Sequence, residues 1–204
     1  MRMRKRKKIE ELKAEINCCE KCRLHQTRTN ALCGEGNLDA RLMLIAQAPG
    51  DAEDREGRMF IGPSGKVLNE LLDESGIKRD EIYMTNLVKC KLPKNRRPKQ
   101  DEIEACSSFL DQEIILVNPS LIAPLGYYAS LYILKKYNIP APKPRSEFSG
   151  LLGKIFFSGS KTIVPLPHPS SLIYNRSFKP GAIAKYKTLK GLLEGSGDDR
   201  QPRQ

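Results

Sequence analysis

Four short apolar runs constrain the fold of this chain more than any other feature. Each is too short for a buried helix and is bounded by turn residues, as buried strands are. The runs are residues 42–46, 82–88, 121–125 and 162–166, with a shorter candidate strand at 155–157. Helical patterns separate or flank them, at residues 9–16, 64–75, 100–117, 126–137 and 179–193. Strands that alternate with helices predict a parallel sheet covered by helices on both faces.

Polar side chains interrupt or follow three of these runs, at Gln47, Asn86 and His168. The carboxyl ends of parallel strands meet at one edge of a sheet, which is where α/β proteins bind ligands. We therefore expect these three residues to converge in space. The loop after Gln47 carries an acidic cluster and ends in glycines, and we expect it to form part of the same site.

The length of 204 residues suits one well-packed domain. We expect a disordered basic arm at residues 1–8, a single domain at 9–194 and a flexible tail at 195–204. No apolar run approaches the roughly 18 residues that span a bilayer, and the basic start is followed by the charged segment IEELKAEI rather than by a signal-peptide core. We expect a cytoplasmic protein, without a membrane partner.

Positive charge is concentrated in two segments. The net charge is +11, and residues 1–8 and 89–99 each hold six Lys or Arg and no acid, which leaves −1 for the rest of the chain. Two basic segments on a nearly neutral body favour an anionic partner, and nucleic acid is the commonest. The alternative is that these charges only improve solubility.

Six cysteines in such a protein favour a metal site over disulfides. Cys19 and Cys22 form a C-x2-C pair, Cys90 follows a strand and Cys106 lies on a helix. Dispersed thiolates of this kind suit an iron–sulfur cluster, whereas a zinc ribbon needs a second C-x2-C pair. Small buried hydrophobic residues are the alternative interpretation. Cys18 and Cys33 are surplus to a four-thiolate site.

Three motifs resemble those of the family 4 uracil-DNA glycosylases, the iron–sulfur type of bacteria and archaea. The first reads AQAPGDAED followed by GRMFIGPSG, the second begins TNLVKC and ends at Cys106, and the third is HPS. The resemblance covers roughly residues 15–193. It implies an α/β/α sandwich around a four-stranded parallel sheet and a structural [4Fe–4S] cluster on Cys19, Cys22, Cys90 and Cys106. It also implies uracil-containing DNA, single- or double-stranded, as the substrate, and we expect a monomer.

The resemblance also implies roles in a pocket that holds an extruded base. Asn86 would pair with uracil O4 and N3–H, Phe60 would stack on the ring, and His168 would donate to O2. Glu53 would screen out the thymine methyl group, and Gln47 and Ala48 would complete the pocket. The structural alternatives are a turn Asn, a core Phe, a structural His and a solvated acid. The residues expected to contact the DNA backbone are Ser64, Lys94, Arg96, Arg97, Ser170 and Ser171.

One residue departs from the family pattern where chemistry is expected. Gln47 stands where the family has a Glu that is thought to orient or activate the attacking water. An amide cannot accept that proton, but it can hold a water molecule by hydrogen bonds. The first hypothesis is therefore a monofunctional uracil-DNA glycosylase in which Gln47 positions water and His168 stabilises the leaving base. The alternatives are a glycosylase for hypoxanthine or xanthine, a lesion-binding protein without turnover, and a zinc-bound nucleic-acid module.

Overall fold

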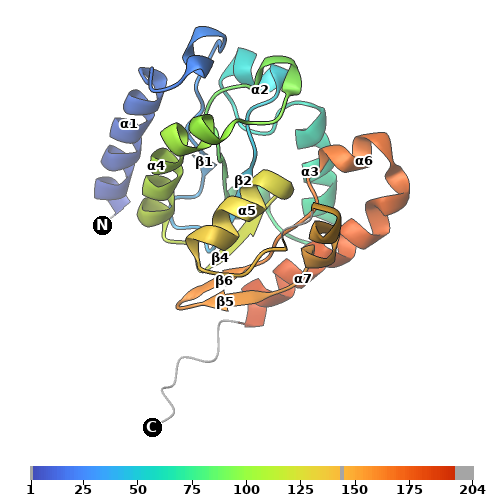
Figure 1. The fold of residues 1–204 in the computed structure, drawn as a ribbon. Coiled ribbons are helices and arrows are strands. Elements are labelled where there is room, and N and C mark those ends of the chain that lie inside the picture. Colours follow the sequence, from blue (N-terminus) through green and yellow to red (C-terminus); the bar gives the residue numbers. More distant parts are fainter. Residues whose placement is uncertain (1, 143–144, 196–204) are drawn as a thin grey trace.

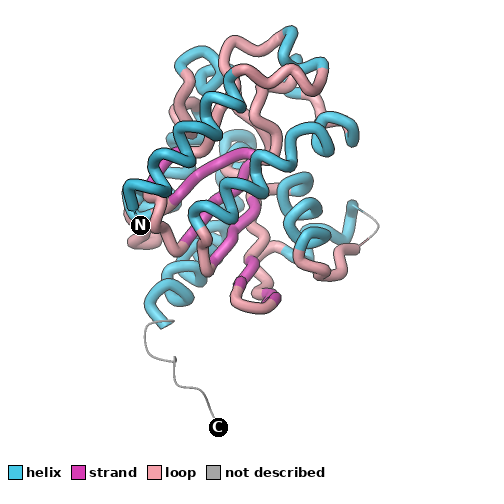
Figure 2. Tube along the Cα trace, turned by 90° about the vertical axis from the view of Figure 1, so that its left-hand side faces the viewer, coloured by secondary structure: helices cyan, strands magenta, loops and turns pink. Residues whose placement is uncertain are grey.

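The computed structural model describes residues 2–142 and 145–195, and this part of the chain folds around one six-stranded sheet with helices on both faces (Figures 1 and 2). The strand order is β1-β3-β2-β4-β6-β5. The strands are β1 Glu35–Gly36, β2 Leu42–Ala46, β3 Tyr83–Asn86, β4 Leu121–Pro124, β5 Phe156–Ser158 and β6 Lys161–Ile163.

The four inner strands β3, β2, β4 and β6 are parallel, as expected. β1 and β5 pair antiparallel at the two edges and make the sheet mixed. β2, β3 and β4 are buried throughout, which explains why β2 and β4 are continuous apolar runs rather than alternating ones, whereas β6 is only partly buried. The fourth apolar run forms a shorter strand than expected, and a single bridge from Leu125 to Leu166 continues the pairing.

The helices form two layers. They are α1 Arg2–Asn17, α2 Asp51–Glu56, α3 Pro63–Glu74, α4 Gln100–Val117, α5 Tyr127–Lys136, α6 Ser170–Tyr174 and α7 Lys179–Gly195. Short 3-10 helices are η1 Arg23–Gln26, η2 Arg79–Glu81, η3 Pro93–Asn95, η4 Arg145–Leu151 and η5 Arg176–Phe178. Because side chains alternate along a strand, Met43 and Ile45 of β2 pack against α1, α4 and α5, while Leu42 and Leu44 pack against α3 and α7. The expected three-layer sandwich is confirmed.

Residues 2–8, part of the expected disordered arm, form the first turns of α1, which begins at Arg2. Arg and Lys are good helix formers. Lys5 Nζ also donates to the carbonyl of Leu38 at 3.2 Å and pairs with Asp39 at 2.8 Å. Ile9, with Leu12 and Ile16 further along, buries one face of α1 against the core. Of the expected tail, only Gly195 lies in the described residues, where it ends α7.

Three further differences lie next to the expected site. Residues 51–56, expected as part of a loop, form the short helix α2, and residues 170–174, for which no element was predicted, form α6. Helix α3 begins at Pro63 with Gly62 as its N-cap, one residue before the predicted start at Ser64. Among the helices of the described residues, none has the length and apolarity to cross a membrane.

Candidate active site and cysteine site

The three polar residues expected to converge lie at one edge of the sheet. Asn86 ends β3 and is the register partner of Ala46, so Gln47 follows directly on the neighbouring strand. Gly126, which follows β4, lies against His168: a Cβ atom at Gly126 would come within 3.2 Å of His168 Cβ. The order Asn86, Gln47, Gly126, His168 therefore follows the strand order β3-β2-β4-β6.

The protonation state of His168 is set by the turn that follows it. The backbone N–H of Ser170 donates to His168 Nδ1 at 3.2 Å, and Ser170 Oγ lies 2.8 Å from the same atom. A nitrogen that accepts a hydrogen bond carries no proton, so the neutral ring carries its proton on Nε2. Burial lowers the pKa of His168 to about 4. His168 therefore presents a neutral Nε2–H donor at neutral pH.

The acidic cluster after Gln47 holds the loop together. Glu53 is 8% exposed, and its Oε1 accepts the backbone N–H of Gly62 at 2.9 Å. Asp54 Oδ1 accepts the backbone N–H groups of Thr29 and Asn30 at 3.0 and 3.2 Å. The solvated-acid interpretation of Glu53 is therefore wrong, since its carboxylate joins the two halves of the first motif.

Phe60 is held in an unusual backbone conformation. Its φ of 53° lies in the left-handed region, which a residue with a large side chain rarely adopts. A Cβ atom at residue 65 would come within 1.9 Å of the Phe60 carbonyl oxygen, so this position requires Gly65. Arg79 donates to the carbonyl oxygens of Met59 and Phe60 at 2.7 and 3.4 Å. Backbone strain of this kind is commonest at functional sites, which makes Phe60 a candidate site residue.

Asn86 and Phe60 are both withdrawn from solvent, at 2% and 6% exposure. Asn86 Nδ2 donates to the sulfur of Met59 at 3.4 Å, which is a weak acceptor. Ala48 is half-buried in the loop that also carries Phe60. The amide of Asn86 thus has capacity left for a stronger partner.

The basic segment 89–99 is less exposed than its composition suggests. Lys89 is buried and pairs with Glu113, and Lys91 pairs with Asp51. Arg96 makes a two-pronged contact with the buried carboxylate of Glu102, at 2.8 and 2.5 Å. These three cations stabilise the loop. The exposed cations of the segment are Lys94, Arg97 and Lys99.

A family model described as the uracil DNA glycosylase superfamily matches residues 33–188. The chain belongs to the uracil-DNA glycosylase superfamily. A type-4 uracil-DNA glycosylase of Thermotoga maritima is 40% identical, over 84% of this chain and 87% of the relative. Relatives of the same name from Saccharolobus solfataricus and Sulfurisphaera tokodaii are 39% and 38% identical, each over 90% of this chain and over 91% and 84% of their own lengths. The chain is therefore a member of the type-4 family, as its motifs indicate.

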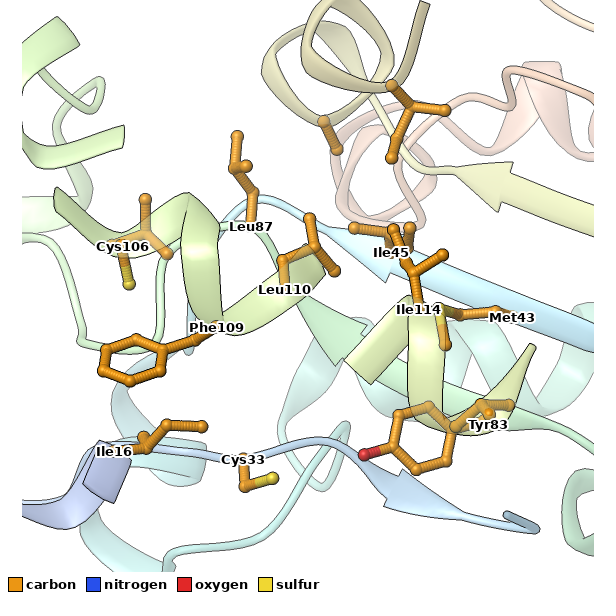
Figure 3. Close-up of a cluster of buried hydrophobic side chains, with 14 of the residues drawn as sticks. Ile16, Cys33, Met43, Ile45, Tyr83, Leu87, Cys106, Phe109, Leu110 and Ile114 are labelled. Atoms are coloured by element: carbon orange, nitrogen blue, oxygen red, sulfur yellow. The ribbon is translucent and has the colours of Figure 1, made fainter. Parts of the chain in front are cut away.

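In this type-4 chain, the four cysteines singled out from the sequence line one pocket together with Ile16 and Phe109. Figure 3 shows Cys106 and Phe109 on α4 beside Ile16 at the end of α1. Cys19 and Cys22 lie on the turn after α1, and Cys90 lies after β3. Cys18 is exposed, while Cys33 is buried beside Glu113, so neither lines the pocket. None of the six cysteines, all of which the structure describes, forms a disulfide.

The surroundings of these thiols favour bound thiolates. The Lys89 backbone N–H donates to Cys106 Sγ at 3.1 Å, and Arg28 Nη1 donates to Cys90 Sγ at 3.3 Å. Burial raises the pKa of Cys106 to about 12, so this thiol ionises at neutral pH only when a cation binds it. In the described residues, no three His, Cys, Asp or Glu side chains converge closely enough to hold a single metal ion.

Two residues beside these sites were not singled out from the sequence. Tyr174, on α6 directly after the HPS motif, is 89% exposed, while the neighbouring Leu172 is 3% exposed. Arg28 also reaches the carbonyl oxygens of Cys19 and Asn17, at 2.7 and 2.8 Å. The apolar run Leu172-Ile173-Tyr174 directly after the HPS motif could have drawn attention to Tyr174, but Arg28 carries no signal in the sequence.

Proposed function

We propose that this protein removes uracil from DNA by hydrolysing its N-glycosidic bond, leaving an abasic site. The observation that carries the proposal is the fixed Nε2–H donor of His168 at the sheet edge where Asn86 ends β3. Membership in the type-4 family supports the same reaction.

Asn86 is suited to read the base. A side-chain amide supplies one acceptor and one donor, which match the N3–H and O4 groups of uracil; held in that orientation, the amide mismatches the corresponding groups of cytosine. Its burial strengthens this selection, because a wrong base leaves buried polar groups without partners. Phe60 would stack on the ring, and Glu53 would hold the loop that carries Phe60 close to the pyrimidine C5 edge.

His168 is suited to stabilise the leaving group. Breaking the bond from the sugar to N1 leaves negative charge on the base, much of it on O2. The Nε2–H group would donate to O2 as this charge develops, the role that oxyanion-hole donors have in other enzymes. A neutral imidazole donates without transferring its proton, which agrees with the low pKa of His168.

Gln47 would hold the attacking water. It is half-buried and directly follows β2. In the strand order, β2 lies between β3, which ends at Asn86, and β6, which precedes His168. Its amide oxygen can accept a hydrogen bond from water, but it supplies no full negative charge to the cationic sugar. We therefore propose that Gln47 supports turnover at a rate no higher than a carboxylate would give.

We propose that Cys19, Cys22, Cys90 and Cys106, which line one pocket, hold a [4Fe–4S] cluster. The irons of a cluster occupy separate corners, so its thiolates need not converge on one point as those of a single zinc ion do. Four free thiols lining one largely apolar pocket, with N–H donors aimed at two sulfurs, support a cluster over zinc. When bound, the cluster would join the turn after α1, the loop after β3 and α4.

DNA would lie across the sheet edge above His168. Lys94 and Arg97 would contact phosphates, which makes binding salt dependent, and Arg96 would shape the loop through Glu102. Tyr174 would press against the bases beside the extruded nucleotide. The other contacts that we propose are Ser64, Ser170 and Ser171, the last two also holding His168 in place. The protein would act as a monomer on cytoplasmic DNA.

An assay on an oligonucleotide with one uracil, followed by cleavage at abasic sites, tests the proposal. We expect the iron-loaded wild type to release uracil and His168→Ala to release it at least 100-fold more slowly. Parallel substrates carrying hypoxanthine or xanthine test for another base. Tight binding of the uracil duplex without release of any base would show a lesion-binding protein and would refute the enzymatic function.

A further inference from the structure

A buried ion pair lies behind Asn86, and neither the proposed reaction nor the cysteine site uses it. Lys89 and Glu113 are 1% and 0% exposed, and Lys89 Nζ lies 2.5 Å from Glu113 Oε2. Glu113 also accepts hydrogen bonds from the backbone N–H of Gly34 at 2.7 Å and from Thr85 Oγ1 at 2.5 Å. A buried pair of this kind is weak evidence for stability, because desolvation offsets most of the attraction.

The ammonium group of Lys89 also reaches back to the residue that would read the base. It donates to the backbone carbonyl of Asn86 at 2.8 Å and to Thr85 Oγ1 at 2.7 Å. Asn86 lies where β3 ends, so its buried carbonyl needs a donor from outside the sheet. Lys89 supplies this donor from three residues further along the chain.

The other end of Lys89 is fixed by the cysteine pocket, since its backbone N–H donates to Cys106 Sγ. Glu113 on α4 holds the ammonium group from the opposite side. Lys89 therefore fixes the position of the Asn86 carbonyl, because its backbone N–H is held by Cys106 and its ammonium group by Glu113. The side-chain amide of Asn86 itself has only the weak contact with Met59, so its direction depends on the backbone that carries it.

We propose that Lys89 is a positioning residue for Asn86, and that the buried pair with Glu113 exists to hold the base-reading amide in register with the uracil edge. This inference rests on the proposed function. It adds a specificity determinant outside the pocket, because small displacements of a positioning group reduce turnover steeply.

The test compares wild type with Lys89→Met/Glu113→Gln, which removes both charges while it keeps side-chain length and leaves an acceptor for Gly34. The control is Lys161→Met, because Lys161 also holds a carbonyl, that of Pro119 at 2.6 Å, but at the opposite edge of the sheet. Each change is made with Asn86 and with Asn86→Ala, so that the dependence on Asn86 is measured directly. Thermal unfolding and the visible absorption of the cluster report whether the variants are folded and loaded.

We expect the double variant to lose about 100-fold in kcat/KM for uracil release in the Asn86 background. In the Asn86→Ala background we expect less than about 2-fold, because the residue through which Lys89 acts is gone. An equal loss in both backgrounds, or no loss in a folded variant, would overturn the inference. If the double variant does not fold, Thr85→Val loosens the same network and should show a smaller loss with the same dependence on Asn86.

The wild-type protein alone tests the proposed function, which fails if this protein releases no uracil. In that case the same variants are compared by their Kd for a uracil-containing duplex relative to the matching thymine duplex. The inference then predicts that Lys89→Met/Glu113→Gln raises this ratio toward 1, because uracil is no longer favoured, and that Lys161→Met leaves it unchanged. An unchanged ratio in the double variant would overturn it.

Discussion

Replacing His168 with alanine should change both catalysis and the pH dependence of stability. The pKa of His168 is lowered from 6.5 to about 4 by burial, so the folded protein holds the ring neutral where the unfolded chain would protonate it. The contribution to stability is complete above pH 6.5 and is lost as the pH falls from there toward 4. Because proton binding is linked to unfolding, these two pKa values predict that His168 lowers the free energy of unfolding of the wild type by about 2 kcal/mol when the pH falls from 7.5 to 5.

Urea unfolding at the two pH values measures this difference. Each protein is compared with itself, so the pH-independent cost of removing the ring cancels. We expect the wild type to lose about 2 kcal/mol more than His168→Ala on going to pH 5. Equal losses in the two proteins would show that the ring is not held neutral, and the tautomer assigned from Ser170 would then lose its support.

The same change should lower kcat for uracil release by about 100- to 1,000-fold, the usual effect of removing one donor to a developing anion. The wild-type kcat should show no inflection near pH 6.5, since the folded ring titrates near 4. A midpoint near 6.5 in the kcat profile would contradict a neutral donor and would point to general acid catalysis.

Three further predictions concern the surroundings of the site. Tyr174→Ala should reduce kcat/KM on uracil-containing duplex about 10-fold through lost stacking. Phe157, which is exposed on β5, serves as the control, and Phe157→Ala should leave kcat/KM unchanged. Equal effects of the two substitutions would refute a DNA contact at Tyr174. Glu53→Ala should destabilise the protein to urea by about 1–3 kcal/mol by leaving the Gly62 N–H buried without an acceptor, and the exposed Glu56→Ala serves as control. Anaerobically purified protein should carry about four irons per chain, and chelating them should lower Tm; bound zinc without iron would exclude the cluster.

The central strands β2 and β4 could be predicted from sequence because they are buried on both faces, and such strands are continuous apolar runs. Helix α4 was predicted with its observed bounds, since its apolar face is regular and Asn118 ends it in a left-handed conformation. The edge strand β1 has two residues and carries no periodicity. The helical start of α1 was not predicted, because a run of positive charges does not by itself indicate a helix. The ion pair that holds this segment, from Lys5 to Asp39, joins residues that are far apart in the sequence.

The site was predictable at the level of position but not of partners. Topology alone places Gln47, Asn86 and His168 at one edge. Pairing depends on tertiary structure, so the sequence counted Lys89, Lys91 and Arg96 as surface cations when they are held by carboxylates. The same limit applies to the tautomer of His168.

The most direct test of the account is uracil release by wild type beside Gln47→Glu, with both proteins carrying equal iron. In the proposed mechanism, Gln47 positions water in an otherwise complete active site. We expect wild type to release uracil and Gln47→Glu to release it at least as fast, because a carboxylate adds a proton acceptor and a negative charge near the cationic sugar. Loss of activity in Gln47→Glu, or no release by either protein, would contradict it.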